Sequence, residues 1–370
     1  MKYITIPSFK KLAFMGLVFI ILLIIAEIVL SWLKIFPDDY YTMTPNSGFT
    51  WTITPNEIIG IQGDSEIAFD AIGARSISNL EDKKNKIVVF GGSTTACFAL
   101  TQQLTWPALL EKKLGDTYWV GNFGRPGNSS NHHTLQFKHI LEKPELKEVK
   151  TVLIMQGVND FVGSLVSKER YINSDTKTLT KFAFQHTPED HLPFHKKLTL
   201  YKLAVSAKNK IKFQLKHKEH LTKAVASITN LRHNAELTNE LPDVTESLNH
   251  YEKNTLELIR LAKAKGIHLI FIQQATMWKP DLEEEYEKLL LTSGFENNNG
   301  FYSTTALYHG MEIFNEKLKN ICKQNNVEFI DLDLPKTTES FYDDFHFNES
   351  GARLVSDRVF TALTTKGLLK

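Results

Sequence analysis

A serine that could act as a nucleophile lies in the stretch 91–95, Gly-Gly-Ser-Thr-Thr, directly after the apolar run 87–90. A glycine-flanked turn from a strand into a helix leaves the hydroxyl of Ser93 accessible at a helix N-terminus, where an attacking serine can be held. The same letters also make an ordinary helix N-cap. Taken alone, the stretch therefore favours an ordinary cap over a nucleophile.

A base for such a serine is present near the C-terminus, in the stretch 343–346, Asp-Asp-Phe-His. His346 follows Asp343 by three residues. An imidazole can take the proton of a serine hydroxyl while a carboxylate orients the ring. A lone pair of this spacing is common, so it gains meaning only together with the serine.

Two further loops carry groups that could stabilise an oxyanion. Gly127 lies in a loop rich in Gly, Asn and Ser, and its backbone N–H could approach a substrate oxygen closely because it has no side chain. Asn159, in the stretch 157–160 of sequence Gly-Val-Asn-Asp, offers a neutral amide donor. The alternatives are a turn that needs positive φ at Gly127 and an Asx-turn or helix cap at Asn159.

The elements that must position these residues alternate between strands and helices. Apolar runs predict buried strands at 87–90, 118–122, 152–155, 268–272 and 327–332. Periodicity predicts helices at 106–114, 135–141, 246–265, 313–325 and 352–363. The alternation predicts a doubly wound parallel sheet, covered by helices on both faces, that binds its ligand at the carboxyl ends of the strands.

The order of Ser93, Gly127, Asn159 and the Asp343/His346 pair resembles the SGNH, or GDSL-type, hydrolase superfamily, whose four letters these residues match. The resemblance runs from about residue 86 to 363. The segment 60–75 and the apolar N-terminus are also similar to those of membrane-anchored bacterial members. The resemblance implies an α/β fold, a three-layer αβα sandwich with a five-stranded parallel sheet (the flavodoxin-like SGNH hydrolase fold), preceded by one transmembrane helix.

The resemblance also implies a role for each residue. Ser93 attacks an ester carbonyl, His346 takes its proton and returns it to the leaving alcohol, and Asp343 orients His346. The backbone N–H groups of Ser93 and Gly127 and the amide of Asn159 form the oxyanion hole. No cofactor or metal is needed for this chemistry.

Asp344 competes with Asp343 for the orienting role, and the D-x-x-H spacing favours Asp343. The sequence departs from the namesake motif at Gly92, where Gly-Asp-Ser-Leu has an aspartate. The implied function is a serine esterase that hydrolyses acyl esters, with acetylated cell-envelope glycans as the first substrate hypothesis. An O-acyltransferase that uses the same triad and an inactive SGNH-fold binding module are the alternatives.

Composition and the N-terminus limit where the protein works. The 370 residues carry 43 Lys+Arg and 42 Asp+Glu, a net charge of +1 that argues against nucleic-acid binding. Residues 12–33 are apolar apart from Glu27 and long enough to cross a membrane. Lysines at 2, 10 and 11 place residues 1–11 in the cytoplasm and the rest outside. A cleaved signal peptide is the alternative, and Glu27 is expected to be a tolerated charge near the interface.

The predicted organisation is a cytoplasmic N-terminus (1–11), a transmembrane anchor (12–33), a juxtamembrane segment (35–80) and a hydrolase domain (81–370). An insertion at about 164–245 is expected to be partly helical. Nine lysines and one acid between 196 and 223 indicate a basic amphipathic helix there. N-x-S sequons at Asn128 and Asn348 lie in the predicted site loops, where a glycan would block the active site. The protein is therefore expected in a compartment where such sequons are not glycosylated, which favours a bacterial periplasm.

Overall fold

The computed structural model of the chain describes residues 8–33, 35–36, 38–53, 58–188, 193–216, 237–290 and 301–369. They fall into two compact units. The first unit combines Met1–Asp39 with Pro188–Lys223, and the second combines Tyr40–Thr187 with Ala224–Lys370. All predicted site residues belong to the second unit.

A five-stranded parallel sheet in the order β4-β3-β5-β7-β9 forms the centre of the second unit. Its strands β3 and β5 are buried along nearly their whole length, as their continuous apolar runs predict. The sheet confirms the predicted parallel architecture. The strands are β3 (Asn85–Gly91), β4 (Tyr118–Asn122), β5 (Thr151–Met155), β7 (His268–Ile272) and β9 (Glu328–Ile330).

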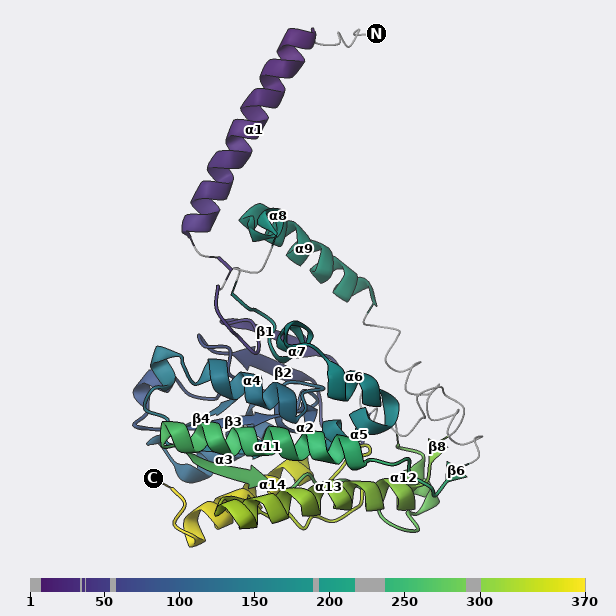
Figure 1. Ribbon diagram of the computed structural model, residues 1–370. Helices are drawn as coiled ribbons and strands as arrows, with labels where there is room; N and C mark the ends of the chain where they lie inside the picture. The colour runs from purple at the N-terminus through teal and green to yellow at the C-terminus, as the bar shows by residue number, and fades with distance from the viewer. Residues whose placement is uncertain are drawn as a thin grey trace. The chain divides into compact units, whose positions relative to one another are not determined.

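Helices cover the sheet in two layers. In one group α11 packs against α4 and α13, and in the other α14 packs against α3. Together with the sheet they make the expected three-layer αβα sandwich (Figure 1). The main helices are α3 (Trp106–Leu114), α4 (Ser130–Ile140), α11 (Thr245–Lys265), α13 (Thr304–Asn325) and α14 (Glu349–Thr365). Shorter elements are α2 (Ser93–Ala96), α5 (Val158–Val166), α12 (Glu284–Glu287), η1 (Leu80–Asp82), η2 (Gln102–Leu104) and η3 (Pro144–Leu146).

Polar caps explain where two helices begin earlier than their apolar periodicity predicts. Helix α4 begins at Ser130 because Ser129 and His132 form a capping box at its N-terminus. Helix α13 begins at Thr304 because the hydroxyl of Ser303 accepts a hydrogen bond from the N–H of Ala306. The predicted starts at 135 and 313 were therefore too late by one to several turns.

The segments predicted as juxtamembrane and as an insertion contain regular structure. Within 35–80, β1 (Ser47–Trp51) and β2 (Ser65–Phe69) form an antiparallel hairpin, and residues from Tyr40 onward belong to the second unit. Within 164–245, α6 (Lys168–Asn173) and α7 (Thr176–Ala183) belong to the second unit. Strand β6 (Leu237–Thr238) pairs there with β8 (Phe301–Tyr302). Residues 189–192 and 217–236 of this insertion lie outside the described residues.

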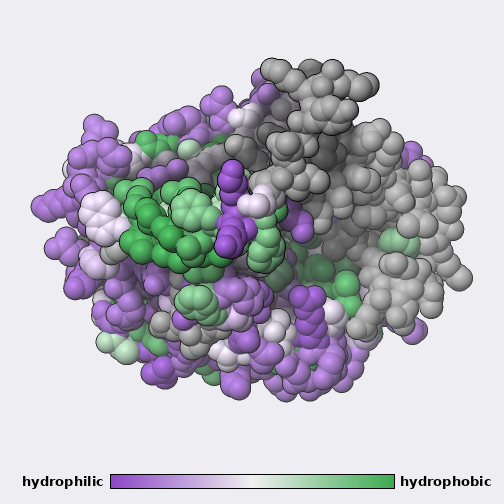
Figure 2. Space-filling model, turned by 90° about the horizontal axis from the view of Figure 1, so that it is seen from above, coloured by the Kyte–Doolittle hydropathy of each residue, from purple (hydrophilic) through white to green (hydrophobic). Residues whose placement is uncertain are grey.

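The first unit contains α1 (Phe9–Trp32), α8 (Phe194–Lys197) and α9 (Thr199–Lys216). Helix α1 is long and apolar enough to cross a membrane, and none of its residues is buried. Its hydrophobic side chains form the continuous green cluster in Figure 2. The expected apolar helix is thus present, and the basic stretch that follows Lys196 forms α9.

Glu27 has partners, which the prediction of a merely tolerated charge did not foresee. Its carboxylate accepts hydrogen bonds from the backbone N–H groups of Thr199 (2.6 Å) and Leu200 (2.9 Å), the first residues of α9. The hydroxyl of Ser31, one turn along α1, also donates to it (3.0 Å). Glu27 therefore caps the N-terminus of α9 from another helix.

Candidate active site

Ser93 lies just past the carboxyl end of strand β3, as the first residue of the short helix α2. The two positions before it are glycines because neither has room for a side chain. A Cβ at Gly91 would lie 2.0 Å from Oγ1 of Thr95, and one at Gly92 would lie 2.4 Å from Nδ2 of Asn159. The second glycine, which departs from the namesake motif, therefore gives the amide of Asn159 room beside the serine turn.

A chain of hydrogen bonds connects Ser93 to a buried carboxylate. Nε2 of His346 lies 2.7 Å from Oγ of Ser93, and Nδ1 of His346 lies 2.7 Å from Oδ2 of Asp343. The backbone N–H groups of Phe345 and His346 also donate to Oδ1 of Asp343, at 3.1 and 2.9 Å. Asp343 is only 4% exposed, so its orientation is set by these donors. A proton can pass from the serine to the imidazole in this arrangement.

Charge at this site favours a proton on His346. Burial lowers the pKa of His346, but the charge and hydrogen bond of Asp343 outweigh it, with a further contribution from Asp344, and the pKa ends above its ordinary value. Asp344 contacts a different partner, since its Oδ1 accepts a hydrogen bond from Nε1 of Trp278 at 2.9 Å. The carboxylate that contacts the imidazole ring is thus Asp343, as the spacing predicts.

Three donors converge near the serine from neighbouring strand ends. Among the described residues, no acceptor takes a hydrogen bond from the backbone N–H of Ser93 or of Gly127. Gly127 has φ of 80°, a conformation that side chains disfavour. One hydrogen of Nδ2 of Asn159 goes to the carbonyl of Asn128 at 2.8 Å, which leaves the second for a ligand. These groups could together bind an oxyanion.

The motif search missed Arg75, which holds the end of the serine helix. Its guanidinium donates to the carbonyls of Ala96 (2.7 Å), Cys97 (2.9 Å) and Leu100 (2.6 Å). The side chain is 3% exposed, and burial lowers its pKa to about 10. These bonds hold the backbone that follows Ser93, and Arg75 thereby helps to position the serine. Nothing in its local sequence indicates this contact.

Asp160, the neighbour of Asn159, accepts hydrogen bonds from two other helices next to the candidate oxyanion hole. It accepts hydrogen bonds from the backbone N–H of Ser130 (3.0 Å) and from the hydroxyls of Ser130 (2.5 Å) and Tyr171 (2.7 Å). Burial raises the pKa of Asp160 to about 6 against the effect of these donors. Helices α4, α5 and α6 are thereby connected through one carboxylate.

Several histidine, aromatic and asparagine side chains near the motifs are buried. His132 and His133 are buried, and His132 lines a pocket beside Gly127 and Asn159. Phe123, Phe161 and Trp278 are fully buried, so they belong to the core. The sequon residues Asn128 and Asn348 are each 1% exposed, and Asn348 caps α14 through the N–H of Gly351.

Comparison with known proteins gives a family and several similar folds. The model of the GDSL-like lipase/acylhydrolase family matches residues 89–354. Similar solved structures include the esterase EstA from Pseudoalteromonas sp. (14% identity, TM-score 0.41, covering 77% of this chain and 100% of that one). A member of the lipolytic protein G-D-S-L family from Veillonella parvula has 14% identity and a TM-score of 0.39, covering 75% of this chain and 98% of that one. The acetylxylan esterase Axe2 from Geobacillus stearothermophilus has 14% identity and a TM-score of 0.39, covering 76% of this chain and 95% of that one. No curated protein sequence matches the chain.

Proposed function

The chain belongs to the GDSL-like lipase/acylhydrolase family, and we propose that it is a serine esterase in which Ser93, His346 and Asp343 form the catalytic triad. The observation that carries the proposal is the 2.7 Å contact between Oγ of Ser93 and Nε2 of His346, with Asp343 on the other ring nitrogen. This geometry argues against an inactive binding module, because such a module has no need for an aligned serine, base and carboxylate.

The proposed reaction has two halves. Oγ of Ser93 attacks the ester carbonyl while Nε2 of His346 takes its proton, and the carbonyl oxygen becomes an oxyanion. His346 then gives the proton to the leaving alcohol, which leaves an acyl group on Ser93. A water molecule, deprotonated by Nε2 of His346, attacks this acyl-enzyme. His346 then returns the proton to Oγ of Ser93 as the carboxylic acid departs, which restores the free enzyme. Asp343 stabilises the imidazolium in both halves.

We propose that the N–H groups of Ser93 and Gly127 and the amide of Asn159 bind the oxyanion. Their free hydrogens support this assignment, as does the close fit of the Asn159 amide against Gly92. Preorganised donors of this kind are the largest contribution to many acyl-transfer reactions, because they need no reorganisation when the charge develops.

We propose acetyl esters on cell-envelope glycans as substrates and the outer face of a bacterial cytoplasmic membrane as the location. The substrate class comes from the family resemblance, and the location from the apolar helix α1 and the lysines before it. Protease added to intact spheroplasts should then degrade the second unit. Full protection of that unit from protease would contradict the orientation.

Turnover of an aryl acetate by the full-length chain in detergent tests the proposed activity. The wild-type chain should release the aryl alcohol, and Ser93→Ala should lower kcat by about 10⁴- to 10⁶-fold. Ser78→Ala, a change at another serine of the second unit, serves as the control and should keep its turnover. Equal rates for the wild type and Ser93→Ala, with both proteins folded, would contradict the proposal.

A further inference from the structure

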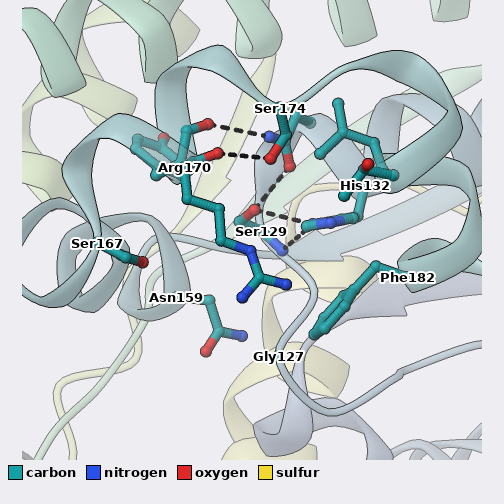
Figure 3. A pocket seen from close by; sticks show the side chains of 13 residues that line it. Gly127, Ser129, His132, Asn159, Ser167, Arg170, Ser174 and Phe182 are labelled. Carbon is teal, nitrogen blue, oxygen red and sulfur yellow. Dashed lines mark hydrogen bonds between the residues drawn. The ribbon is translucent and has the colours of Figure 1, made fainter.

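A pocket of about 200 Å³ opens beside the proposed oxyanion hole. Gly127 and Asn159 form one side of it, and α6 and α7 supply the other (Figure 3). A Cβ at Gly127 would lie 3.0 Å from the ring of Phe182, so the aromatic ring closes the pocket next to the glycine. A substituent bound in this pocket would be attached, a few bonds away, to the ester whose carbonyl oxygen lies in the proposed oxyanion hole.

Most of the residues that line the pocket have polar side chains, which can pair with hydroxyl groups of a ligand. Most of these polar side chains already have partners within the protein. The hydroxyl of Tyr171 donates to Asp160, that of Ser129 to Asn131, and that of Ser174 to the carbonyl of Arg170.

The guanidinium of Arg170 is the exception. In Figure 3 its side chain reaches from α6 into the pocket, between Asn159 and Phe182. Among the described residues, no carboxylate or carbonyl accepts a hydrogen bond from this guanidinium. Lys168, on the same helix, differs in this respect because its Nζ lies 3.1 Å from a carboxylate oxygen of Glu246. The charge of Arg170 is therefore available to a ligand.

No opposing charge lines the pocket. None of its described lining residues is acidic, and its histidine stays neutral. Nδ1 of His132 accepts a hydrogen bond from the N–H of Ser129 at 3.1 Å, which places the ring proton on Nε2. Burial, with the charges of His133, Arg125 and Arg170, lowers the pKa of His132 to about 3. Arg170 thus gives the lining its single full charge, and that charge is positive.

We propose that Arg170 binds an oxyanion carried by the substrate, a carboxylate or a phosphate, and so makes the enzyme selective for esters of anionic sugars or polyols. This inference rests on the proposed esterase function and narrows its substrate class. The planar guanidinium offers a fork of donors that matches either anion with two parallel hydrogen bonds. The neighbouring hydroxyl and amide groups suit the remaining hydroxyls of such a substrate.

The inference can be tested by comparing matched pairs of acetylated substrates. One pair is mono-O-acetylated glucuronic acid and mono-O-acetylated methyl glucoside, and the other is acetylated glycerol phosphate and acetylated glycerol. The full-length chain in detergent is assayed for acetate release, with an aryl acetate as a separate measure of the basic activity. The two anions distinguish a carboxylate from a phosphate ligand.

The wild type should prefer at least one anion over its neutral counterpart in kcat/KM. Arg170→Gln should lower that preference about 10- to 100-fold, mainly through KM, because a charged hydrogen-bond donor is lost. Arg170→Lys should keep part of the preference. Lys168→Gln removes the same charge from the same helix outside the pocket lining, and it should leave the preference unchanged.

Two outcomes would overturn the inference in distinguishable ways. Turnover of the aryl acetate without any preference for either anion, or with a preference that Arg170→Gln does not reduce, would overturn the role of Arg170 alone. Absence of aryl acetate turnover in the folded wild-type chain would overturn the proposed esterase function, and the role of Arg170 with it.

Discussion

Asp343 in the second unit and Glu27 in the first unit make similar contacts with partners at very different distances along the chain. Asp343 accepts hydrogen bonds from the backbone N–H groups at 345 and 346, and Glu27 accepts them from those at 199 and 200. Asp343 also contacts an imidazole that faces a serine, whereas Glu27 also contacts the hydroxyl of Ser31. In the proposed mechanism Asp343 orients the base of the triad, whereas Glu27 caps the start of a helix.

The difference teaches which contacts a sequence reveals. The partners of Asp343 lie two and three residues away, so a short motif contains them. Those of Glu27 lie 172 and 173 residues away, and only the folded chain brings them together. The following predictions test whether the two carboxylates differ in function as they differ in their partners.

The largest effect is expected from Asp343→Asn, which should lower kcat about 10⁴-fold by favouring the wrong tautomer of His346. Asp344→Asn is the matched control, because an asparagine keeps an oxygen that can accept from Trp278, and it should cost less than about tenfold. Steady-state kinetics with an aryl acetate measure both variants. If Asp344→Asn were the more damaging change, the triad assignment would be wrong.

The pH dependence of the rate, measured for the wild type and for Asp343→Asn, sharpens the comparison. His346 must be neutral to act as a base, and Asp343 raises its pKa above the ordinary value. The rate of the wild type should therefore rise with pH through a midpoint above about 6.5. In Asp343→Asn the residual rate should rise at lower pH, because the effect of burial on the pKa of His346 is then opposed only by the smaller contribution of Asp344. An unchanged midpoint would mean that Asp343 does not set the protonation of this histidine.

Asn159→Ala should lower kcat by about 10²- to 10³-fold with little change in folding, because one oxyanion donor is removed. Asn173→Ala, which changes an asparagine that bonds only to the exposed Glu169, is the control. Thermal unfolding measured beside the kinetics separates a lost donor from a lost fold. A rate within a few-fold of the wild type would remove Asn159 from the oxyanion hole.

Gly92→Ala should have a smaller effect, up to about 10²-fold, because the new Cβ would displace the amide of Asn159 by a fraction of an ångström to an ångström. The loss should appear in kcat, and it should not add fully to that of Asn159→Ala, since both changes act on the same donor. Full additivity of the two effects would mean that the glycine acts elsewhere.

Much of the fold follows from local patterns. Strands β4 and β7 and helix α3 have the predicted bounds, because buried parallel strands are continuous apolar runs and α3 ends at a glycine. The helix starts at Ser130 and Thr304 escaped prediction, because polar caps rather than apolar periodicity determine them. The predicted site residues follow strand ends, so the topology of the sheet brings them together.

The positions of the side chains of Arg75, Arg170 and Glu27 in the fold could not be predicted from the sequence. Arg75 donates to the carbonyl of Ala96, 21 residues later in the chain, and Arg170 lines a pocket between helices α4, α5, α6 and α7. Charged side chains are mostly exposed in proteins, so the residue type alone gives no indication of such a role. These contacts depend on how distant segments pack.

The smallest effect on catalysis is expected from Glu27→Ala. The loss of an N-cap costs about 1 kcal/mol, so amide hydrogen exchange in the first turn of α9 should speed up several-fold. Turnover of an aryl acetate should stay the same, since Glu27 and the triad belong to different units. Ser31→Ala, which keeps the carboxylate, should give a smaller change in exchange. Unchanged exchange in both variants would show that Glu27 does not cap α9 in solution.

Labelling of the full-length chain with a fluorophosphonate, followed by peptide mass spectrometry, tests the central claim most directly. An activated serine next to a base reacts with this probe, whereas an ordinary helix cap does not. The account predicts one adduct, on Ser93, and loss of the adduct in His346→Ala. An adduct on another serine, or no adduct in a chain whose circular dichroism shows it folded, would contradict it.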